Sequence, residues 1–153
     1  MSILRKILLA VLIILIGIQF IRPAKNNGVL DNPKEIGKIV QVPENIKLIL
    51  KTACYDCHSN QTFYPWYSEI MPLGWWLNHH VEEGKEHLNF SVFGDYSKKR
   101  QDHKLEEVKE ETEEKEMPLE SYTWYHKNAS LSDDQIKLIV DWVDAARKEL
   151  KNK

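Results

Sequence analysis

Apolar residues are concentrated in one stretch near the N-terminus. The run from Ile7 to Ile21 is interrupted only by Gly17 and Gln19. Spanning a bilayer takes about 17–25 apolar residues and a signal-peptide core about 7–15, so this run lies at the border between the two. The run is apolar on every face, which argues against a buried core helix. We therefore expect residues 1–22 to form a signal-anchor, that is, an N-terminal transmembrane helix.

Two basic residues, Arg5 and Lys6, precede the apolar run. Positive charges before a first membrane helix keep the N-terminus in the cytoplasm and place the rest of the chain outside. We therefore expect a single-pass membrane protein, attached to the membrane by this anchor, with its folded part on the far side of the membrane from the cytoplasm. A cleaved signal peptide is the alternative, and it would export the folded part just the same.

A short amphipathic helix is expected after a linker. Residues 23–42 contain two prolines and several Gly, Asn and Asp, which is typical of a linker. Pro43 suits a first helical turn, and Ile46, Ile49 and Leu50 follow at helical spacing. The pattern predicts a helix that runs from this proline toward the first cysteine.

The C-terminal segment predicts a second amphipathic helix. Ser132 is a good N-cap, and Gln135 three residues later completes a capping box. Ile136, Ile139 and Val143 then fall on one helical face. This segment should pack its apolar side on the core.

The middle of the chain is irregular. Prolines break the aromatic stretch 63–76 into short pieces, and residues 98–116 are almost wholly charged. In the charged stretch Leu105, Val108 and Thr112 form a thin apolar stripe, so we expect a largely solvated helix. No strand pattern of useful length appears. We expect residues 43–150 to be one small all-α domain with long loops.

Composition narrows the function classes. The chain has 153 residues, a formal net charge of -2 and a pI near 6.3. It carries no basic surface of the kind that binds nucleic acid, so no nucleic-acid partner is expected. It has only two cysteines, which makes their position the most informative chemical signal in the sequence.

Both cysteines fall in one motif, Cys-x-x-Cys-His, formed by Cys54, Cys57 and His58. This is the signature of c-type haem attachment. Residues three apart lie on one helical face, so two thiols can reach the two vinyl groups of one porphyrin. The histidine that follows can then ligate the iron. Tyr55 and Asp56 between the thiols are expected to point elsewhere and to vary freely.

Two other interpretations of the Cys-x-x-Cys-His motif, a zinc site and a redox dithiol, stay open. A zinc site usually needs four ligands, so His79, His80 or His126 would have to join the motif, and no second paired motif is present. A redox dithiol expects a βαβ context, and none is visible. The haem interpretation is favoured because it accounts for the histidine and agrees with the expected export.

The sixth iron ligand is expected to be a methionine. Methionine or histidine usually fills this position, and Met71 and Met117 are the candidates beyond the initiator. Met71 follows His58 closely and is expected to pack in the core, whereas Met117 lies far enough downstream to cross the ring. Bis-histidine ligation through His79 or His80 is the alternative, and at most one of these adjacent residues could ligate because they face different directions.

Several aromatic residues are candidates for the wall or edge of a haem site. They are Trp66, Tyr67, Trp75, Trp76, Tyr122 and Trp124. A core role without haem contact is an equal alternative for each of them.

Longer stretches resemble a known family. "CYDCHSNQTFYPWYSEIMPLGWW", "GKEHLNFSVF" and "EMPLESYTWYHKNASLSDDQIKLIVDW" resemble the bacterial haem-binding domain family of membrane-anchored, c-type-cytochrome-like proteins, over about residues 35–150. The resemblance implies a cytochrome-c-like helical fold and one haem c. Together with the expected anchor, it implies a single-pass protein of the bacterial inner membrane whose haem domain lies in the periplasm or is otherwise exported. Cys54 and Cys57 would bind this haem covalently, and His58 and Met117 would ligate its iron.

The expected function is therefore periplasmic electron transfer by a non-enzymatic haem protein, which needs a redox partner protein. The first alternative is a haem-based sensor or small peroxidase with an open or labile sixth site. The second is a zinc- or thiol-based binding module without haem.

Overall fold

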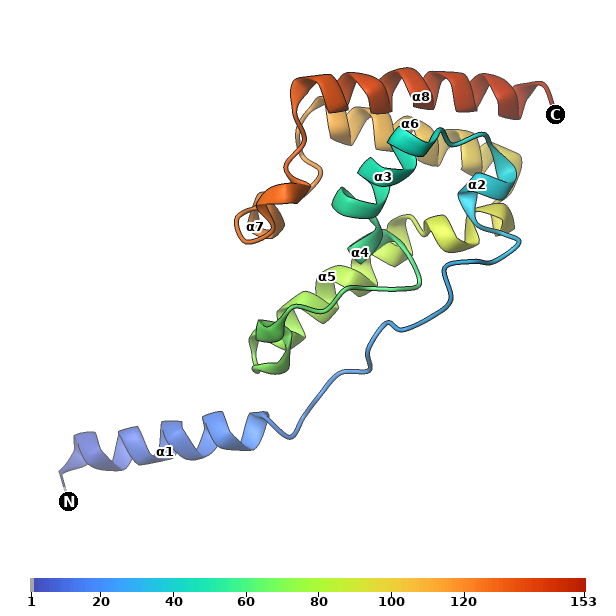
Figure 1. Ribbon diagram of the computed structural model, residues 1–153. Helices are drawn as coiled ribbons and strands as arrows, with labels where there is room; N and C mark the ends of the chain where they lie inside the picture. The colour runs from blue at the N-terminus through green and yellow to red at the C-terminus, as the bar shows by residue number, and fades with distance from the viewer. Residues whose placement is uncertain (1) are drawn as a thin grey trace.

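The computed structural model describes residues 2–153 and consists of helices joined by loops, with one isolated β-bridge between Asn27 and Gln61. Figure 1 shows their arrangement, with α6 and α8 side by side and α3, α4 and α5 below them. The all-helical prediction is confirmed for these residues. The elements are α1 (Ile3–Ile18), α2 (Ile36–Ile39), α3 (Glu44–Ala53), α4 (Tyr55–His58), η1 (Trp66–Glu69), α5 (Leu73–His87), η2 (Phe90–Asp95), α6 (Lys98–Glu113), α7 (Glu120–Thr123), η3 (Lys127–Ala129) and α8 (Asp133–Lys151).

Both predicted amphipathic helices form. Helix α3 begins directly after Pro43 and buries Ile46, Ile49 and Leu50. At the start of α8 the Gln135 N–H donates to the Ser132 hydroxyl at 3.2 Å, and the Ser132 N–H donates to the Gln135 side chain at 2.9 Å. This reciprocal capping satisfies two N–H groups that would otherwise lack partners.

Helix α6 is less solvated than its charge suggests. Leu105 is completely buried, and Thr112, seven residues later on the same helical face, is also buried. Both lie where α6 packs on α8. Arg147 of α8 donates to both carboxylate oxygens of Asp102, at 2.8 and 3.1 Å, and to Glu106 at 2.9 Å. These ion pairs raise the pKa of Arg147 and fix the register of the two helices.

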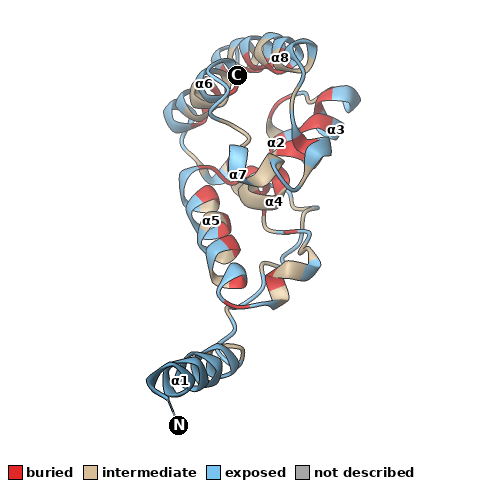
Figure 2. Cartoon of the chain, turned by 90° about the vertical axis from the view of Figure 1, so that its left-hand side faces the viewer, coloured by how far each residue is buried: buried red, intermediate tan, exposed pale blue. Residues whose placement is uncertain are grey.

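The hydrophobic core lies where α2, α3, η2, α6 and α8 meet. Phe90 and Phe93 of η2 are the largest fully buried side chains. Figure 2 shows the buried positions on the inward faces of α3, α5 and α8. Ile36 and Val40, from the segment expected to be a linker, are also buried in this core.

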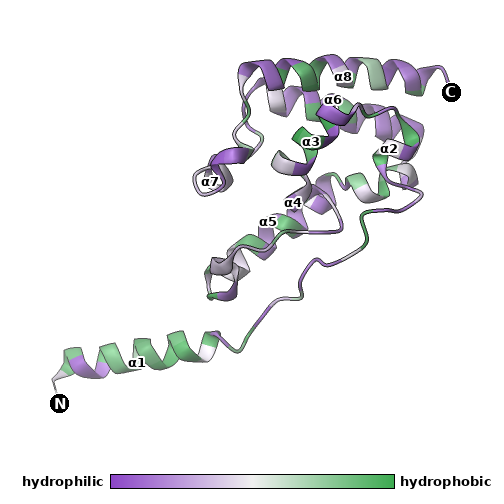
Figure 3. Ribbon diagram, viewed as in Figure 1, coloured by the Kyte–Doolittle hydropathy of each residue, from purple (hydrophilic) through white to green (hydrophobic). Residues whose placement is uncertain are grey.

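The prediction of an N-terminal transmembrane helix is wrong. Among residues 2–153, no helix is both long enough and apolar enough to cross a membrane. The apolar helix α1, mostly green after its first turn in Figure 3, ends at Ile18 with 16 residues. At about 1.5 Å per residue it is about 24 Å long, against a hydrocarbon core about 30 Å thick. The predicted single-pass inner-membrane localisation depended on this helix, so that prediction is wrong as well.

The end of α1 is held by the folded part of the chain. The Gln19 side-chain amide exchanges two hydrogen bonds with the backbone of Met71, at 2.9 and 3.0 Å. The Trp75 indole N–H donates to the Ile21 carbonyl at 2.7 Å, and Arg22 pairs with Glu69 at 2.6 Å. These contacts hold the chain just after Ile18, where α1 ends, whereas the apolar pattern predicted a helix through residue 22.

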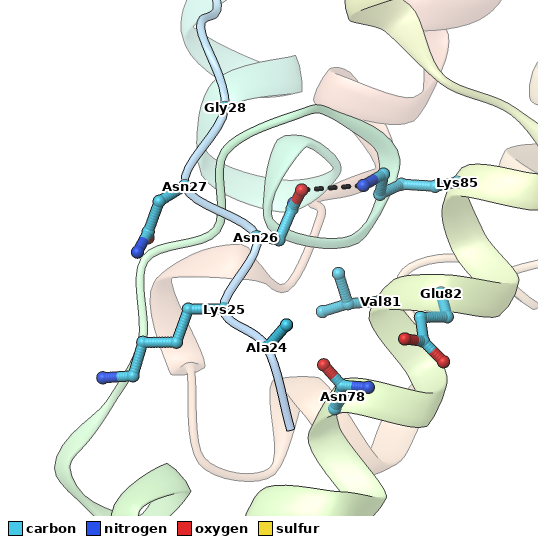
Figure 4. Close-up of a pocket in the computed structure, with 9 residues that line it drawn as sticks. All are labelled: Ala24, Lys25, Asn26, Asn27, Gly28, Asn78, Val81, Glu82 and Lys85. Atoms are coloured by element: carbon cyan, nitrogen blue, oxygen red, sulfur yellow. Dashed lines mark hydrogen bonds between the residues drawn. The ribbon is translucent and has the colours of Figure 1, made fainter. Parts of the chain in front are cut away.

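Asn26 fixes the extended segment that follows. Its side-chain N–H groups donate to the Ser59 carbonyl and the Thr62 hydroxyl, both at 2.9 Å. Its side-chain oxygen accepts from the Lys85 ammonium of α5 at 2.8 Å, the contact drawn in Figure 4 beside a crevice of about 360 Å³. The segment before α2 is therefore part of the folded unit.

This arrangement predicts that Asn26→Ala lowers the free energy of unfolding by about 2–3 kcal/mol, because three side-chain hydrogen bonds are lost and one of them is donated by the Lys85 ammonium. Urea denaturation followed by circular dichroism measures the change. Asn27→Ala is the matched control, since the Asn27 side chain is exposed, and it should stay within about 0.5 kcal/mol of the wild type. Equal stabilities of the two variants would show that the segment is not anchored.

Candidate functional site

A cavity of about 500 Å³ opens between α4, the second half of α5, α6 and the loop that follows α6. Cys54, Cys57 and His58 line this cavity. Met117, about sixty residues later in the sequence, lines it as well. The four residues singled out in the sequence therefore meet at one cavity. Their binding roles remain a prediction.

Helix α4 positions the cysteines and the histidine. Its one turn is closed by the Cys57 and His58 N–H groups, which both donate to the Cys54 carbonyl, at 3.2 and 2.9 Å. The turn brings Cys54 and Cys57 to the same cavity, and both are free thiols. Burial, and for Cys54 the neighbouring Cys57, raises the pKa of each thiol to about 12. Redox-active cysteines need a lowered pKa, so this environment does not suit a reactive dithiol.

His58 is held in the tautomer that suits metal ligation. Its Nδ1 lies 3.0 Å from the Leu88 carbonyl oxygen. A carbonyl can only accept, so Nδ1 carries the proton and Nε2 keeps a free lone pair. Burial lowers the pKa of His58, against the opposing effect of its backbone hydrogen bonds, and keeps the imidazole neutral at neutral pH. A neutral, oriented imidazole is the form that binds iron.

Helix α5 forms one wall of the cavity. His80, Glu83, Gly84 and His87 recur at helical spacing and all line it. A Cβ atom on Gly84 would lie 2.8 Å from the Cys57 carbonyl oxygen and 3.0 Å from the Cys57 Cβ. The glycine therefore lets α5 approach α4 closely enough for the Leu88 carbonyl to reach His58. Of these four residues the sequence analysis singled out only His80, although their i, i+3, i+4, i+7 spacing was a usable signal for the whole wall.

Met117 reaches the cavity because the chain turns sharply after α6. Lys115 has a φ of 61°, the left-handed conformation that ends many helices. The N–H groups of Glu116 and Met117 then both donate to the Glu111 carbonyl at 3.0 Å. These bonds hold Met117, Pro118 and Leu119 against the cavity.

Met71 lies elsewhere. It is 3 % exposed, does not line the cavity, and sits against Gly74, whose added Cβ would be 2.6 Å from the Met71 methyl carbon. This agrees with the packing role expected for it. Its backbone is also the partner of Gln19.

The two residues between the cysteines are not free to vary. The ring of Tyr55 is buried against Phe90, with centroids 5.4 Å apart, and its hydroxyl donates to Glu35 at 2.9 Å. Asp56 accepts the Phe63 N–H at 2.9 Å and the Tyr122 hydroxyl at 2.7 Å. The expectation that they point away from the cavity holds, but the expectation that they are unconstrained is wrong.

The expected aromatic wall is placed differently. Tyr122 lines the cavity, whereas Trp66, Trp76 and Trp124 are largely exposed and do not. Trp66 instead donates its indole N–H to the Tyr125 hydroxyl at 2.7 Å. The apolar side of the cavity comes from residues that include Leu88, Phe90, Val108 and Leu131.

The histidines are separated by the fold. His80 reaches the cavity and packs edge-on against Trp76 at 4.6 Å, while His79 faces solvent. The Nε2 atom of His126 shares a hydrogen bond with the Tyr67 hydroxyl, 3.1 Å away. Across residues 2–153, no group of three or more His, Cys, Asp or Glu side chains is arranged to hold a metal ion. This geometry gives no support to the zinc interpretation.

Comparison with known proteins identifies the family. The profile of the haem-binding domain matches residues 13–145, so the chain belongs to the haem-binding domain family. No curated protein and no solved structure matches the chain significantly. The family assignment supports haem binding, and the cavity described above is the candidate site for it.

The cavity suits a haem in size and chemistry. Its volume lies within the roughly 300–1,000 Å³ typical of cofactor sites. It offers a neutral imidazole, a thioether sulfur and two thiols, which are soft or borderline donors suited to iron or to a porphyrin edge. Apolar side chains fill much of the remaining wall, as a porphyrin face requires.

The contact between α4 and α5 predicts that Gly84→Ala is destabilising. The added methyl group must displace the Cys57 backbone, so we expect a loss of about 2–3 kcal/mol, more than the ~1 kcal/mol that alanine gains over glycine in a helix. Gly17→Ala in α1 is the control, because nothing lies within 4 Å of its added Cβ. Urea denaturation compares the two, and a Gly84→Ala protein as stable as the wild type would refute the close packing.

Proposed function

We propose that this protein is an electron carrier whose single haem is bound covalently by Cys54 and Cys57. The observation that carries the proposal is the meeting of both thiols, His58 and Met117 at one cavity of suitable volume. The raised thiol pKa values, and the lack of a clustered metal site among residues 2–153, weigh against the dithiol and zinc alternatives.

Each residue has a distinct role in this proposal. Cys54 and Cys57 would hold the porphyrin, because each thiol can add across one vinyl group to form a thioether. His58 through Nε2 and Met117 through its sulfur would hold the iron as its fifth and sixth ligands. The bound haem would supply an iron that changes between the ferrous and ferric states. With both of these residues on the iron, no position would be left for a substrate and no enzymatic step would be needed.

The surroundings set the properties of such a site. The Leu88 carbonyl accepts the His58 Nδ1 proton at 3.0 Å, which orients the ring and makes Nε2 a stronger donor. A thioether ligand raises the reduction potential relative to two histidines. The low polarity given by Leu88, Phe90, Val108 and Leu131 disfavours the extra positive charge of ferric iron and acts in the same direction.

The partner in this proposal is another redox protein. The segment from Glu106 to Glu120 carries eight glutamates and two lysines, and Glu107, Glu111 and Met117 of this segment line the cavity. A negative surface beside the redox site favours a partner with a basic docking face, and it makes association faster at low ionic strength.

One observation favours a second candidate function. His80 and His87 line the same cavity, and neither belongs to the proposed ligand set. If Met117 left the iron, either histidine could serve as a base for peroxide chemistry. This would make the protein a haem-based sensor or small peroxidase rather than a carrier.

Absorption spectra of haem-loaded protein, produced with a cytochrome c maturation system, separate these functions. Ferric wild type should be low-spin and show the weak near-red charge-transfer band of methionine-ligated haem. Met117→Leu keeps the volume but removes the sulfur, so it should lose this band completely and have a lower reduction potential.

Met71→Leu is the matched control, and it should keep both the band and the potential because Met71 lies outside the cavity. A high-spin wild type would contradict the carrier proposal and support the labile-site alternative. A band that survives in Met117→Leu but vanishes in Met71→Leu would show that the wrong methionine was assigned.

A further inference from the structure

We infer that the hydrogen bond between Asp56 and Tyr122 is a latch that holds the Met117 loop closed over the cavity. This inference rests on the proposed function and names a positioning pair for its sixth ligand. Asp56 lies between the two cysteines on α4, and Tyr122 lies on α7, five residues after Met117. Their side chains meet at 2.7 Å.

The latch is the direct link between the two halves of the site. Within residues 2–153 it is the one hydrogen bond that joins the segment 54–58 to the segment 117–126. The other bonds of the Met117 loop reach different places: the Met117 N–H reaches Glu111 of α6, and Tyr125 and His126 reach Trp66 and Tyr67 of η1. Among these hydrogen bonds, only that of Tyr122 connects the loop to the segment 54–58, which carries the cysteines.

Asp56 is preorganised to accept this bond. Its Oδ1 accepts the Phe63 N–H at 2.9 Å, and its backbone carbonyl accepts the Thr62 hydroxyl at 2.6 Å. Because these two bonds fix the side chain and its backbone, Oδ2 is left pointing at Tyr122. A hydroxyl bound to an ionised carboxylate makes a stronger hydrogen bond than a neutral pair does.

Tyr122 is also fixed from its other side. Its ring stacks on His126 with centroids 4.5 Å apart and an angle of 17° between the planes, while the ring lines the cavity. The His126 ring is in turn bonded to Tyr67. Tyr122 therefore makes one packing contact, with His126, and one hydrogen bond, to the Asp56 carboxylate. The hydrogen bond can be removed while the packing contact is kept.

Tyr122→Phe removes the hydroxyl and keeps the ring, so it opens the latch without emptying the cavity wall. Binding of carbon monoxide to the ferrous haem reports the opening, because the gas binds only when the sixth position is free. Loss of a hydrogen bond to a charged group should raise the observed rate of carbon monoxide binding by about tenfold or more. The near-red band of the ferric protein should weaken at the same time.

Tyr125→Phe is the matched control. It removes a hydroxyl from the same loop, but its partner is the exposed Trp66 and not α4. Its carbon monoxide rate should stay within about twofold of the wild type, as expected for an exposed hydrogen bond. Adding Tyr122→Phe to Asp56→Ala should raise the rate little beyond Asp56→Ala alone, because both changes remove the same bond.

The outcomes separate the latch from the proposed function. If the wild type lacks methionine ligation, the carrier proposal fails and the latch has no ligand to position. If the wild type is methionine-ligated and Tyr122→Phe behaves as Tyr125→Phe does, the carrier proposal stands and the latch is refuted. Additive effects of Asp56→Ala and Tyr122→Phe would also refute it.

Discussion

The close packing of α4 on α5 is the constraint on which the rest of the site depends. Gly84 lets the Cys57 backbone lie against α5, with no room for a side chain between them. The same approach brings the Leu88 carbonyl to His58 Nδ1 at 3.0 Å. One contact thus sets the position of a thiol and the tautomer of His58, and the cavity wall of His80, Glu83 and His87 follows from the orientation of α5.

The loop after α6 forms another side of the cavity. It turns at Lys115 and returns to the cavity through hydrogen bonds to Glu111 and Asp56. Few hydrogen bonds hold Met117, whereas His58 belongs to a turn packed against a helix. In the proposed function, Met117 is therefore the ligand whose release would separate an electron carrier from a peroxidase.

The sequence predicted local features and missed those that depend on distant contacts. The Ser132 capping box and the apolar spacing of Ile46, Ile49 and Leu50 act within one helix, and both predictions were confirmed. The anchor prediction failed because hydropathy extends to Ile21, while the helix ends where Gln19 bonds to Met71. The role of Asp56 was missed because its partner is 66 residues away.

The central claim is that Cys54 and Cys57 bind one haem covalently in this cavity. Mass spectrometry of the denatured protein, after production with a cytochrome c maturation system, tests it most directly. The claim predicts that the wild-type chain carries the added mass of one haem and that the Cys54→Ser/Cys57→Ser variant has the mass of the chain alone. A wild-type protein that binds haem in its native state but releases it all on denaturation would contradict the claim.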